Sequence, residues 1–226
     1  MRVFQDVQGE SFCIVPEWNR RSVMLVWPAH IRPELKDTYV ELVQFLSRMA
    51  RITLVVAGHP DPEIPVLFPH VGIMSLPEIA DVWIQDWAPL PVKKGTGLLA
   101  CVKSVYDPGY LAGSPWLARK DQKAGRELAH LLGDLIELPL VLDGGGLVSN
   151  GQGLGICTER IVADNQGLHV HSHLRHALGI SKLVVIPEEP FDVTGHVDGI
   201  VRFISPDTLI VGAYPPDYRE GFAYMN

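Results

Sequence analysis

The stretch IELPLVLDGGGLVSNGQGLGICT, residues 136–158, carries the pattern that decides the fold. Residues 136–142 form an apolar run that predicts a buried strand, and this run leads directly into the three glycines of residues 144–146. Residues 147–149 and 153–158 predict a hairpin, because the Asn150-Gly151 pair between them is typical of a tight turn. The stretch therefore predicts a strand, a glycine turn and a strand pair in close succession.

The same alternation of short strands with helices extends over the rest of the chain. The helix expected at residues 35–49 has apolar side chains at helical spacing, namely Tyr39, Leu42, Val43 and Leu46. Further helices are expected at residues 121–132 and 171–178, and further strands at residues 23–27, 52–56, 71–76, 87–92, 97–102, 183–186, 200–204 and 208–212. The order indicates an α/β fold built from a repeated unit of strands and one helix. Residues 1–226 contain no flexible linker, so we expect a single domain.

Composition excludes several classes of function. The chain has 226 residues with a formal net charge of −7, and no basic face that would bind nucleic acid is visible. Its apolar runs are too short to span a bilayer, and no signal peptide is visible, so we expect neither a membrane partner nor export. The three cysteines have no metal-binding spacing, and reduced thiols in a cytoplasmic protein are expected.

The first segment with functional side chains is DVWIQDWAPL, residues 81–90. If the segment is extended, Asp81, Trp83 and Gln85 share one face and Asp86 lies on the other. A carboxylate beside an indole suits a planar cation, because the acid pairs with the charge and the ring face attracts it. Taken alone, the segment favours the alternative of an edge strand with core tryptophans and solvated acids.

The second segment is Asp143-Gly144-Gly145-Gly146. Its glycines permit a tight turn or close approach of a ligand to the backbone. It lacks the GxxxxGK[ST] pattern of a phosphate loop, and on its own it favours a turn over a site.

The third segment is DVTGHVDG, residues 192–199, in which His196 and Asp198 lie two residues apart. A histidine is the usual general acid or base near neutral pH, and an adjacent acid can bind substrate or raise the pKa of the histidine. Gly195 permits unusual backbone angles beside it. A capped turn with a hydrogen-bonded histidine is the alternative.

A histidine-rich tract at residues 169–176 offers a metal site as another hypothesis. On a helix, His169, His173 and His176 share a face, which is ligand spacing. The tract contains no carboxylate that would complete a site, so it favours a solvated helix and no metal is expected.

Together the three segments resemble the agmatine deiminase and bacterial peptidylarginine deiminase family of the guanidino-group-modifying superfamily. The family pattern D-x-W-x-R-D-x-G-P is similar to residues 81–89, and the T-x-G-H-x-D core is similar to residues 194–198 with one residue of slip. The acid-Gly-Gly turn and the Thr-Glu that ends its hairpin are similar to residues 143–145 and 158–159, and the family's opening is similar to residues 16–18 and 27–28. The resemblance extends from about residue 16 to residue 212.

The resemblance implies a pseudo-five-fold α/β propeller of ββαβ units with the active site on its axis. It implies that Asp86 and Asp198 bind the guanidinium nitrogens, that His196 is the acid/base, and that Trp83 forms a wall of the pocket. The other substrate-binding candidates share the same segments: Asp81, Asp143, Gly144, Gly145 and Gly195. The implied substrate is a small cationic guanidino compound, the reaction converts agmatine to N-carbamoylputrescine and ammonia on the way to putrescine, and no cofactor is needed.

The chain also departs from the family pattern. Gln85 replaces the family's arginine, Ala88 its glycine, and Asp143 its more usual glutamate. The family's nucleophilic cysteine belongs to a glycine-rich segment well after the histidine, whereas no cysteine follows Cys157 here. We therefore expect an N-terminal portion of about three blades, with a complementing C-terminal chain or a homo-oligomer as partner, because an open propeller exposes a strand edge.

Two alternatives from other classes stay open. The first is a non-catalytic protein that keeps the guanidinium pocket of Trp83, Asp86 and Asp198. The second is a metal-dependent hydrolase that uses His196 and Asp198.

Overall fold

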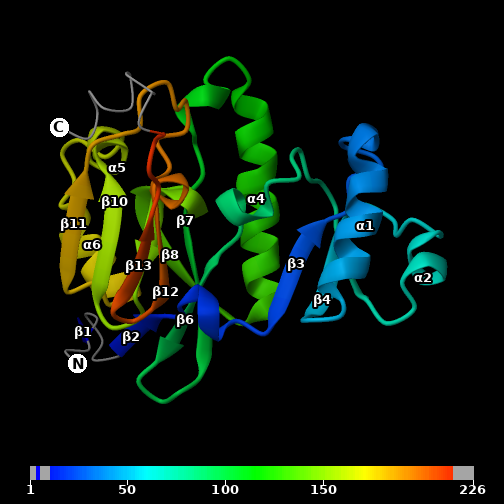
Figure 1. The fold of residues 1–226 in the computed structure, drawn as a ribbon, viewed down its shortest axis with the longest axis horizontal. Helices are drawn as coiled ribbons and strands as arrows, with labels where there is room; N and C mark the ends of the chain where they lie inside the picture. Colours follow the sequence, from blue (N-terminus) through cyan, green and yellow to red (C-terminus); the bar gives the residue numbers. More distant parts are fainter. Residues whose placement is uncertain (1–3, 6–10, 216–226) are drawn as a thin grey trace.

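The computed structural model describes residues 4–5 and 11–215, which form a mixed α/β fold of four sheets (Figure 1). The largest sheet has the strand order β1-β2-β6-β7-β8. Its strands are β1 (Phe4–Gln5), β2 (Ser11–Ile14), β6 (Leu90–Lys94), β7 (Leu99–Val105) and β8 (Asp134–Val141). Strands β6 and β7 are an antiparallel hairpin, and β8 returns parallel to β7 after helix α4 (Pro115–Leu132).

A second unit repeats this ββαβ order. Strands β9 (Leu147–Ser149) and β10 (Leu154–Thr158) are antiparallel, and β11 (Lys182–Ile186) lies parallel to β10. Helices α5 (Glu159–Ala163) and α6 (Val170–Leu178) connect β10 to β11. A third hairpin follows, formed by β12 (Val201–Ser205) and β13 (Thr208–Val211). The expectation of a repeated unit of strands and helix is confirmed in these two copies.

The remaining sheet is parallel, with the order β3-β4-β5, and lies on the right in Figure 1. It comprises β3 (Ser22–Val26), helix α1 (Lys36–Leu46), β4 (Arg51–Ala57), helix α2 (Ile64–Leu67) and β5 (Gly72–Leu76). Helix α4 lies between this sheet and strands β7 and β8, where Ala124 and Leu128 pack with Val26, Val55 and Leu76. One helix thus covers two sheets.

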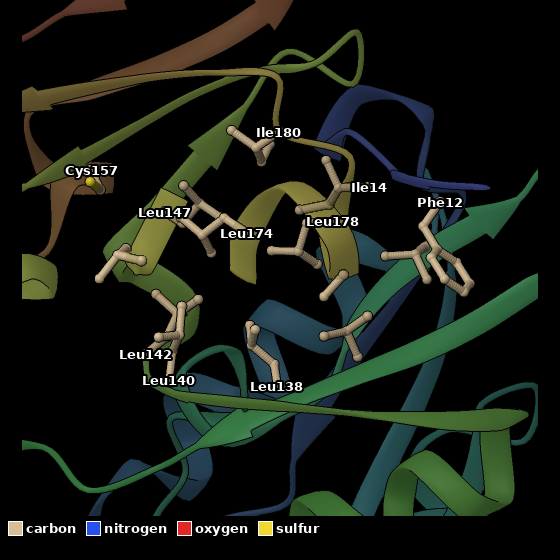
Figure 2. Packing of buried hydrophobic residues seen from close by; sticks show 14 of the residues in the cluster. Phe12, Ile14, Leu138, Leu140, Leu142, Leu147, Cys157, Leu174, Leu178 and Ile180 are labelled. Atoms are coloured by element: carbon tan, nitrogen blue, oxygen red, sulfur yellow. The ribbon is translucent and has the colours of Figure 1, made fainter. Parts of the chain in front are cut away.

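The hydrophobic core of the first two units is built around helix α6 (Figure 2). Leu174 and Leu178 of α6 contact Phe12 and Ile14 of β2 and the leucines of β8. A smaller cluster packs Val148 and Ile156 against Val197, Val201 and Phe203. This cluster fixes residues 197–199, which form a short 3-10 turn named η5 (Val197–Gly199), against β9 and β12.

Two sequence predictions were wrong in detail. Residues 81–90 are not an extended strand, because residues Ile84–Trp87 form a helical turn, α3, in which Ala88 N–H donates to Ile84 O at 2.8 Å. Trp87, expected in a strand, is fully buried in this turn against α4. Helix α4 begins at Pro115, six residues before the expected start at 121, since proline is well suited to the first helical position.

The sequence also missed β1, β2, α2 and α5, all of which are short. Within the residues that the structure describes, none of the helices is both long and apolar enough to cross a membrane.

Candidate active site

The three candidate segments converge at one end of the strands. Turn α3 contacts the 3-10 turn η4 (Gly144–Gly146), and η4 contacts η5. Gly145 lies at the centre: a Cβ there would overlap the ring of His196 and lie 3.0 Å from Asp198 Oδ1. A Cβ on Gly144 would overlap the carbonyl oxygen of Gln85. Gly144 and Gly145 therefore allow the other two segments to pack closely against this one. From the sequence alone, this role could not be distinguished from that of a simple turn.

His196 lies among three carboxylates. Its Nε2 is 3.2 Å from Asp143 Oδ2, and its Nδ1 is 3.9 Å from Asp86 Oδ1. The side chains of His196, Asp86, Asp143 and Asp198 are each at most 15% exposed, so their charges interact with little screening by water. The third carboxylate, Asp198, directs its Oδ1 toward the same space above Gly145.

This crowding changes the proton affinity of both His196 and Asp86. Burial lowers the pKa of His196, but the hydrogen bond with Asp143 and the charges of the nearby aspartates outweigh burial, so the pKa is raised. Burial raises the pKa of Asp86 to about 6; His196 and the Gly145 N–H oppose the rise, and Asp143 and Asp198 add to it. An acid and a base with displaced pKa values in one site are suited to proton transfer near neutral pH.

The backbone around His196 is held by Asp192. The Asp192 carboxylate accepts hydrogen bonds from Thr194 N at 2.9 Å and from His196 N at 3.1 Å. Gly195 has φ +66°, a left-handed conformation, and its carbonyl accepts from Thr158 Oγ1 at 2.5 Å. The alternative of a capped turn was therefore correct as local structure, and this turn is what presents His196 to the carboxylates.

Asp198 is anchored on one oxygen. Its Oδ2 accepts from Gln85 Nε2 at 2.6 Å and from Arg202 Nη2 at 2.8 Å. Arg202 also donates from Nη1 to Glu17 Oε2 at 2.7 Å. The sequence reasoning treated Gln85 only as a departure and overlooked Arg202 and the contact it makes with Glu17. A guanidinium four residues after Asp198 was the signal that could have pointed to Arg202.

Asp81 and Trp83 are placed differently from the other candidates. The Asp81 carboxylate accepts from Val82 N at 2.6 Å, and its carbonyl accepts from Trp87 Nε1 at 3.3 Å, which makes Asp81 part of the turn that holds α3. Trp83 is 57% exposed. The structure thus brings together Asp86, Asp143, His196 and Asp198 with Gly144, Gly145 and Gly195. Trp83 is joined to this group through its main-chain oxygen, which accepts from Asp86 N at 3.0 Å. Within residues 4–5 and 11–215, the side chains of Asp81 and Trp83 make no hydrogen bond to the group.

Three further side chains near the acids were missed. Tyr106 and Tyr110 share a hydroxyl–hydroxyl hydrogen bond of 3.1 Å, and burial raises the pKa of Tyr110 to about 12, with Asp143 and Asp86 contributing. Lys103 is fully buried in β7, where burial lowers its pKa to about 8 against the attraction of Asp143. The sequence signal for Lys103 was a lysine within an apolar strand, LACVKSV.

A cleft of about 460 Å³ opens beside the site. His196, Asp198 and Asp192 form part of its wall, together with Glu189 and the 83% exposed Phe191. The cleft provides space for a small cationic molecule next to the carboxylates.

The three cysteines are not activated. Cys157 is fully buried in the core of Figure 2, and burial raises its pKa to about 11. Burial also raises the pKa of Cys101 and of Cys13, whose thiol donates to Gly151 O at 2.9 Å. A thiol with a raised pKa is a poor nucleophile, because the thiolate is the reactive form.

The histidine tract lies on and just before α6, with His176 Nδ1 2.7 Å from Ser172 O. Over residues 4–5 and 11–215, no group of three or more His, Cys, Asp or Glu side chains is arranged to hold a metal ion.

Comparison with known proteins gives one family. The sequence model described as Porphyromonas-type peptidyl-arginine deiminase matches residues 13–222. The chain is 26% identical over 186 residues to a Photobacterium profundum protein named "Putative agmatine deiminase", and the match covers 76% of this chain and 50% of that protein. A Streptomyces coelicolor protein of the same name is 24% identical over 242 residues, covering 95% of this chain and 71% of that protein.

Solved structures agree in fold. The agmatine deiminase of C. jejuni has a TM-score of 0.81 at 19% identity, covering 96% of this chain and 69% of that chain. The agmatine deiminase of Enterococcus faecalis has a TM-score of 0.78 at 20% identity, covering 95% of this chain and 65% of that chain. The chain thus spans about half the length of the Photobacterium protein and about two thirds of these two structures.

Proposed function

The chain belongs to the Porphyromonas-type peptidyl-arginine deiminase family, and on that premise we propose that its site binds a guanidinium group and takes part in its hydrolysis. The observation that carries the proposal is the group of three carboxylates around His196, each at most 15% exposed, beside a cleft of about 460 Å³. A guanidinium is a planar cation with several N–H donors, so it matches carboxylates better than any neutral ligand does.

Each residue has a role in this proposal. Asp86 and Asp198 bind the guanidinium nitrogens, because Asp86 Oδ1 lies 3.9 Å from His196 Nδ1 and Asp198 Oδ1 borders the space beside Gly145 and His196. Asp143 orients the His196 ring through its contact with Nε2 at 3.2 Å. His196, whose pKa is raised, donates a proton to the departing amine and then accepts one from the attacking water. Trp83, which is 57% exposed and precedes the turn that carries Asp86, forms a wall of the pocket.

The substrate we propose is agmatine, a small amine, in preference to free or peptidyl arginine. The balanced reaction is agmatine plus water giving N-carbamoylputrescine plus ammonia. The three carboxylates and the net charge of −7 both favour a substrate with no carboxylate of its own.

None of the residues assigned a role above is the nucleophile of this reaction. The resemblance implies a cysteine, yet burial raises the pKa of all three cysteines of the chain. We propose that the thiol lies outside residues 1–226, on a chain segment that packs on the β12–β13 hairpin. The apolar side chains of this hairpin support such packing: Ile204, Leu209, Ile210 and Val211 are 39–60% exposed. The full assembly is then the α/β propeller, to which the two ββαβ units and this hairpin belong.

A non-catalytic guanidinium-binding protein is the second candidate. It is favoured by the same raised thiol pKa values and by Gln85 at the position of the family's arginine.

Ammonia release from agmatine by the purified chain tests the proposal, with His196→Ala as the inactive variant. His171→Ala is the matched control, because His171 is exposed on α6 away from the three segments. Release that is lost only in His196→Ala supports catalysis, and replacement of each cysteine then identifies the nucleophile. Binding of agmatine that requires Asp198 but gives no ammonia supports the guanidinium site and shows that residues 1–226 hold no working nucleophile, which both candidates predict for this chain by itself. If the purified chain neither releases ammonia nor binds agmatine, both candidates are refuted.

A further inference from the structure

The Asp198 carboxylate is held by two donors on the same oxygen. Gln85 Nε2 and Arg202 Nη2 donate to Asp198 Oδ2 at 2.6 and 2.8 Å. The Arg202 Nε also donates to the main-chain oxygen of Asp198 at 3.3 Å. One guanidinium thus grips both the side chain and the backbone of the same residue, which fixes the direction of the carboxylate.

The second oxygen of Asp198 faces the other way. Oδ1 is the atom nearest to Gly145 on this residue, in the space that His196 also borders. A carboxylate with one oxygen fully engaged presents only the other to an incoming donor. Free rotation of an unrestrained carboxylate would instead exchange the two oxygens.

The charge of Arg202 is balanced from the opposite side. Glu17 Oε2 accepts from Arg202 Nη1 at 2.7 Å, across 185 residues of sequence. Arg202 therefore bridges Glu17 and Asp198, and a single guanidinium serves two carboxylates. Gln85 contributes its donor without adding a second positive charge beside a site for cations.

We propose that Gln85 and Arg202 are positioning residues that hold Asp198 so that it offers only Oδ1 to a guanidinium ligand, with Glu17 fixing Arg202. The ligand part of this inference rests on the function proposed above. The restraint of Asp198 itself does not, because the direction of its carboxylate also affects His196 when no ligand is added.

The first experiment measures agmatine binding by isothermal titration calorimetry in wild type, Arg202→Lys and Gln85→Met. Lysine keeps the charge but cannot reach Glu17 and both acceptors of Asp198 at once, so Arg202→Lys is expected to weaken binding by roughly five- to tenfold. Gln85→Met removes one donor and is expected to weaken binding by a smaller factor. Arg126→Lys is the matched control, because Arg126 is an exposed arginine paired with Glu137, and it should leave affinity unchanged.

The same substitutions are repeated in an Asp198→Asn background, where the weaker residual binding of agmatine is followed by NMR titration at high agmatine concentration. If Arg202 and Gln85 act through Asp198, their effects on affinity disappear there, because the free energies of coupled residues are not additive. Equal losses in both backgrounds would mean that Arg202 and Gln85 merely support the local structure, and would overturn the inference.

The second readout is the NMR titration of the His196 ring, which needs no ligand. Asp198 is among the charges that raise the pKa of His196. Gln85→Met changes no charge, but it removes a hydrogen-bond donor that partly neutralises the Asp198 carboxylate. The carboxylate then attracts the His196 imidazolium more strongly, so the titration midpoint of the His196 ring should rise. This rise should be seen only when Asp198 is present. Failure of wild type to bind agmatine would refute the proposed function alone. An unchanged His196 midpoint in both Gln85→Met and Arg202→Lys would refute the positioning role.

Discussion

Replacing Lys103 with methionine is expected to stabilise the protein at neutral pH. Lys103 lies in β7 with none of its surface exposed, and its Nζ donates to Ser104 O at 2.7 Å. Its stem packs so closely on α4 that a Cβ on Gly125 would lie 2.5 Å from Lys103 Cε. Methionine is unbranched and of similar length, so it fits this space without the charge.

The size of the effect follows from the pKa of Lys103, which burial lowers to about 8 from the ordinary 10.5. Below pH 8 the lysine is charged in both states, so the folded state carries the full cost of burying the charge. At about 1.36 kcal/mol per pH unit, the difference between 8 and 10.5 is worth about 3 kcal/mol. The variant loses the hydrogen bond to Ser104 O, which costs it about 1 kcal/mol. Its free energy of unfolding at pH 7 should therefore exceed that of wild type by about 2 kcal/mol.

The sign of the pH dependence separates this cause from general repacking. Between pH 8 and 10.5 the unfolded chain binds the proton and the folded chain does not, so the stability of wild type relative to the variant rises with pH. The free energies of unfolding of wild type and Lys103→Met should therefore converge and meet at about pH 10.

Urea unfolding followed by circular dichroism at several pH values between 7 and 10 measures this directly. Lys123→Met is the control for the loss of one positive charge, because Lys123 is an exposed lysine on α4. A Lys103→Met protein less stable than wild type at pH 7, or a stability difference that stays constant with pH, would refute the reasoning.

Three further predictions concern the acids and the glycine turn. Agmatine affinity should fall as the pH drops through about 6, because the pKa of Asp86 is raised to about 6 and its carboxylate must be ionised to bind; calorimetry on Asp86→Asn should find weak binding without this step. Gly145→Ala should abolish agmatine binding, since its Cβ would overlap His196, while Gly113→Ala, with open space around its Cβ and away from the cleft, should bind as wild type does. Asp121 is fully buried with a pKa raised to about 6 from 3.8, so its contribution to stability should increase by about 3 kcal/mol as the pH falls from 6 to 3.8. Asp121→Asn should remove that increase in urea unfolding, and an increase that persists in the variant would contradict the assignment to Asp121.

The parts of the fold that the sequence predicted are those with strong local signals. The hairpin of β9 and β10 was predicted from Asn150-Gly151, and Gly151 has the left-handed φ of +66° that such a turn needs. Strands β3, β4 and β5 were predicted within one or two residues, because they are short apolar runs bounded by proline and glycine.

The parts that failed depend on contacts between distant residues. Nothing within residues 81–90 shows that Trp87 will be buried against α4, and that burial is what turns the segment into a helical turn instead of a strand. The first turn of α4, residues 115–118, follows directly on a segment rich in proline and glycine that favours a loop, so only Pro115 marked the start of the helix.

The residues of the candidate site also fall into a predicted group and a missed group. His196, Asp86, Asp143 and Asp198 were identified because their segments combine titratable side chains with glycines and match a family pattern. Arg202 and Glu17 were missed because their bridge joins residues 185 apart, and Lys103 because a buried lysine looks from sequence like an interruption of a strand.

Lys103 and the site acids are best understood together. Because Gly145 has no side chain, three aspartates can lie close to one histidine. Burial, together with Asp143 and Asp198, raises the pKa of Asp86, and negative charge is concentrated where little water reaches it. Asp143 attracts the Lys103 ammonium from that place, and by reciprocity Lys103 stabilises the negative charge of Asp143, the residue that contacts His196 Nε2. The stability that Lys103→Met gains is therefore expected to come with a change in the His196 titration. The pKa of about 8 already includes the attraction of Asp143, so about 3 kcal/mol is the cost that remains after this attraction, and the same lysine in a core without a nearby carboxylate would cost more to bury.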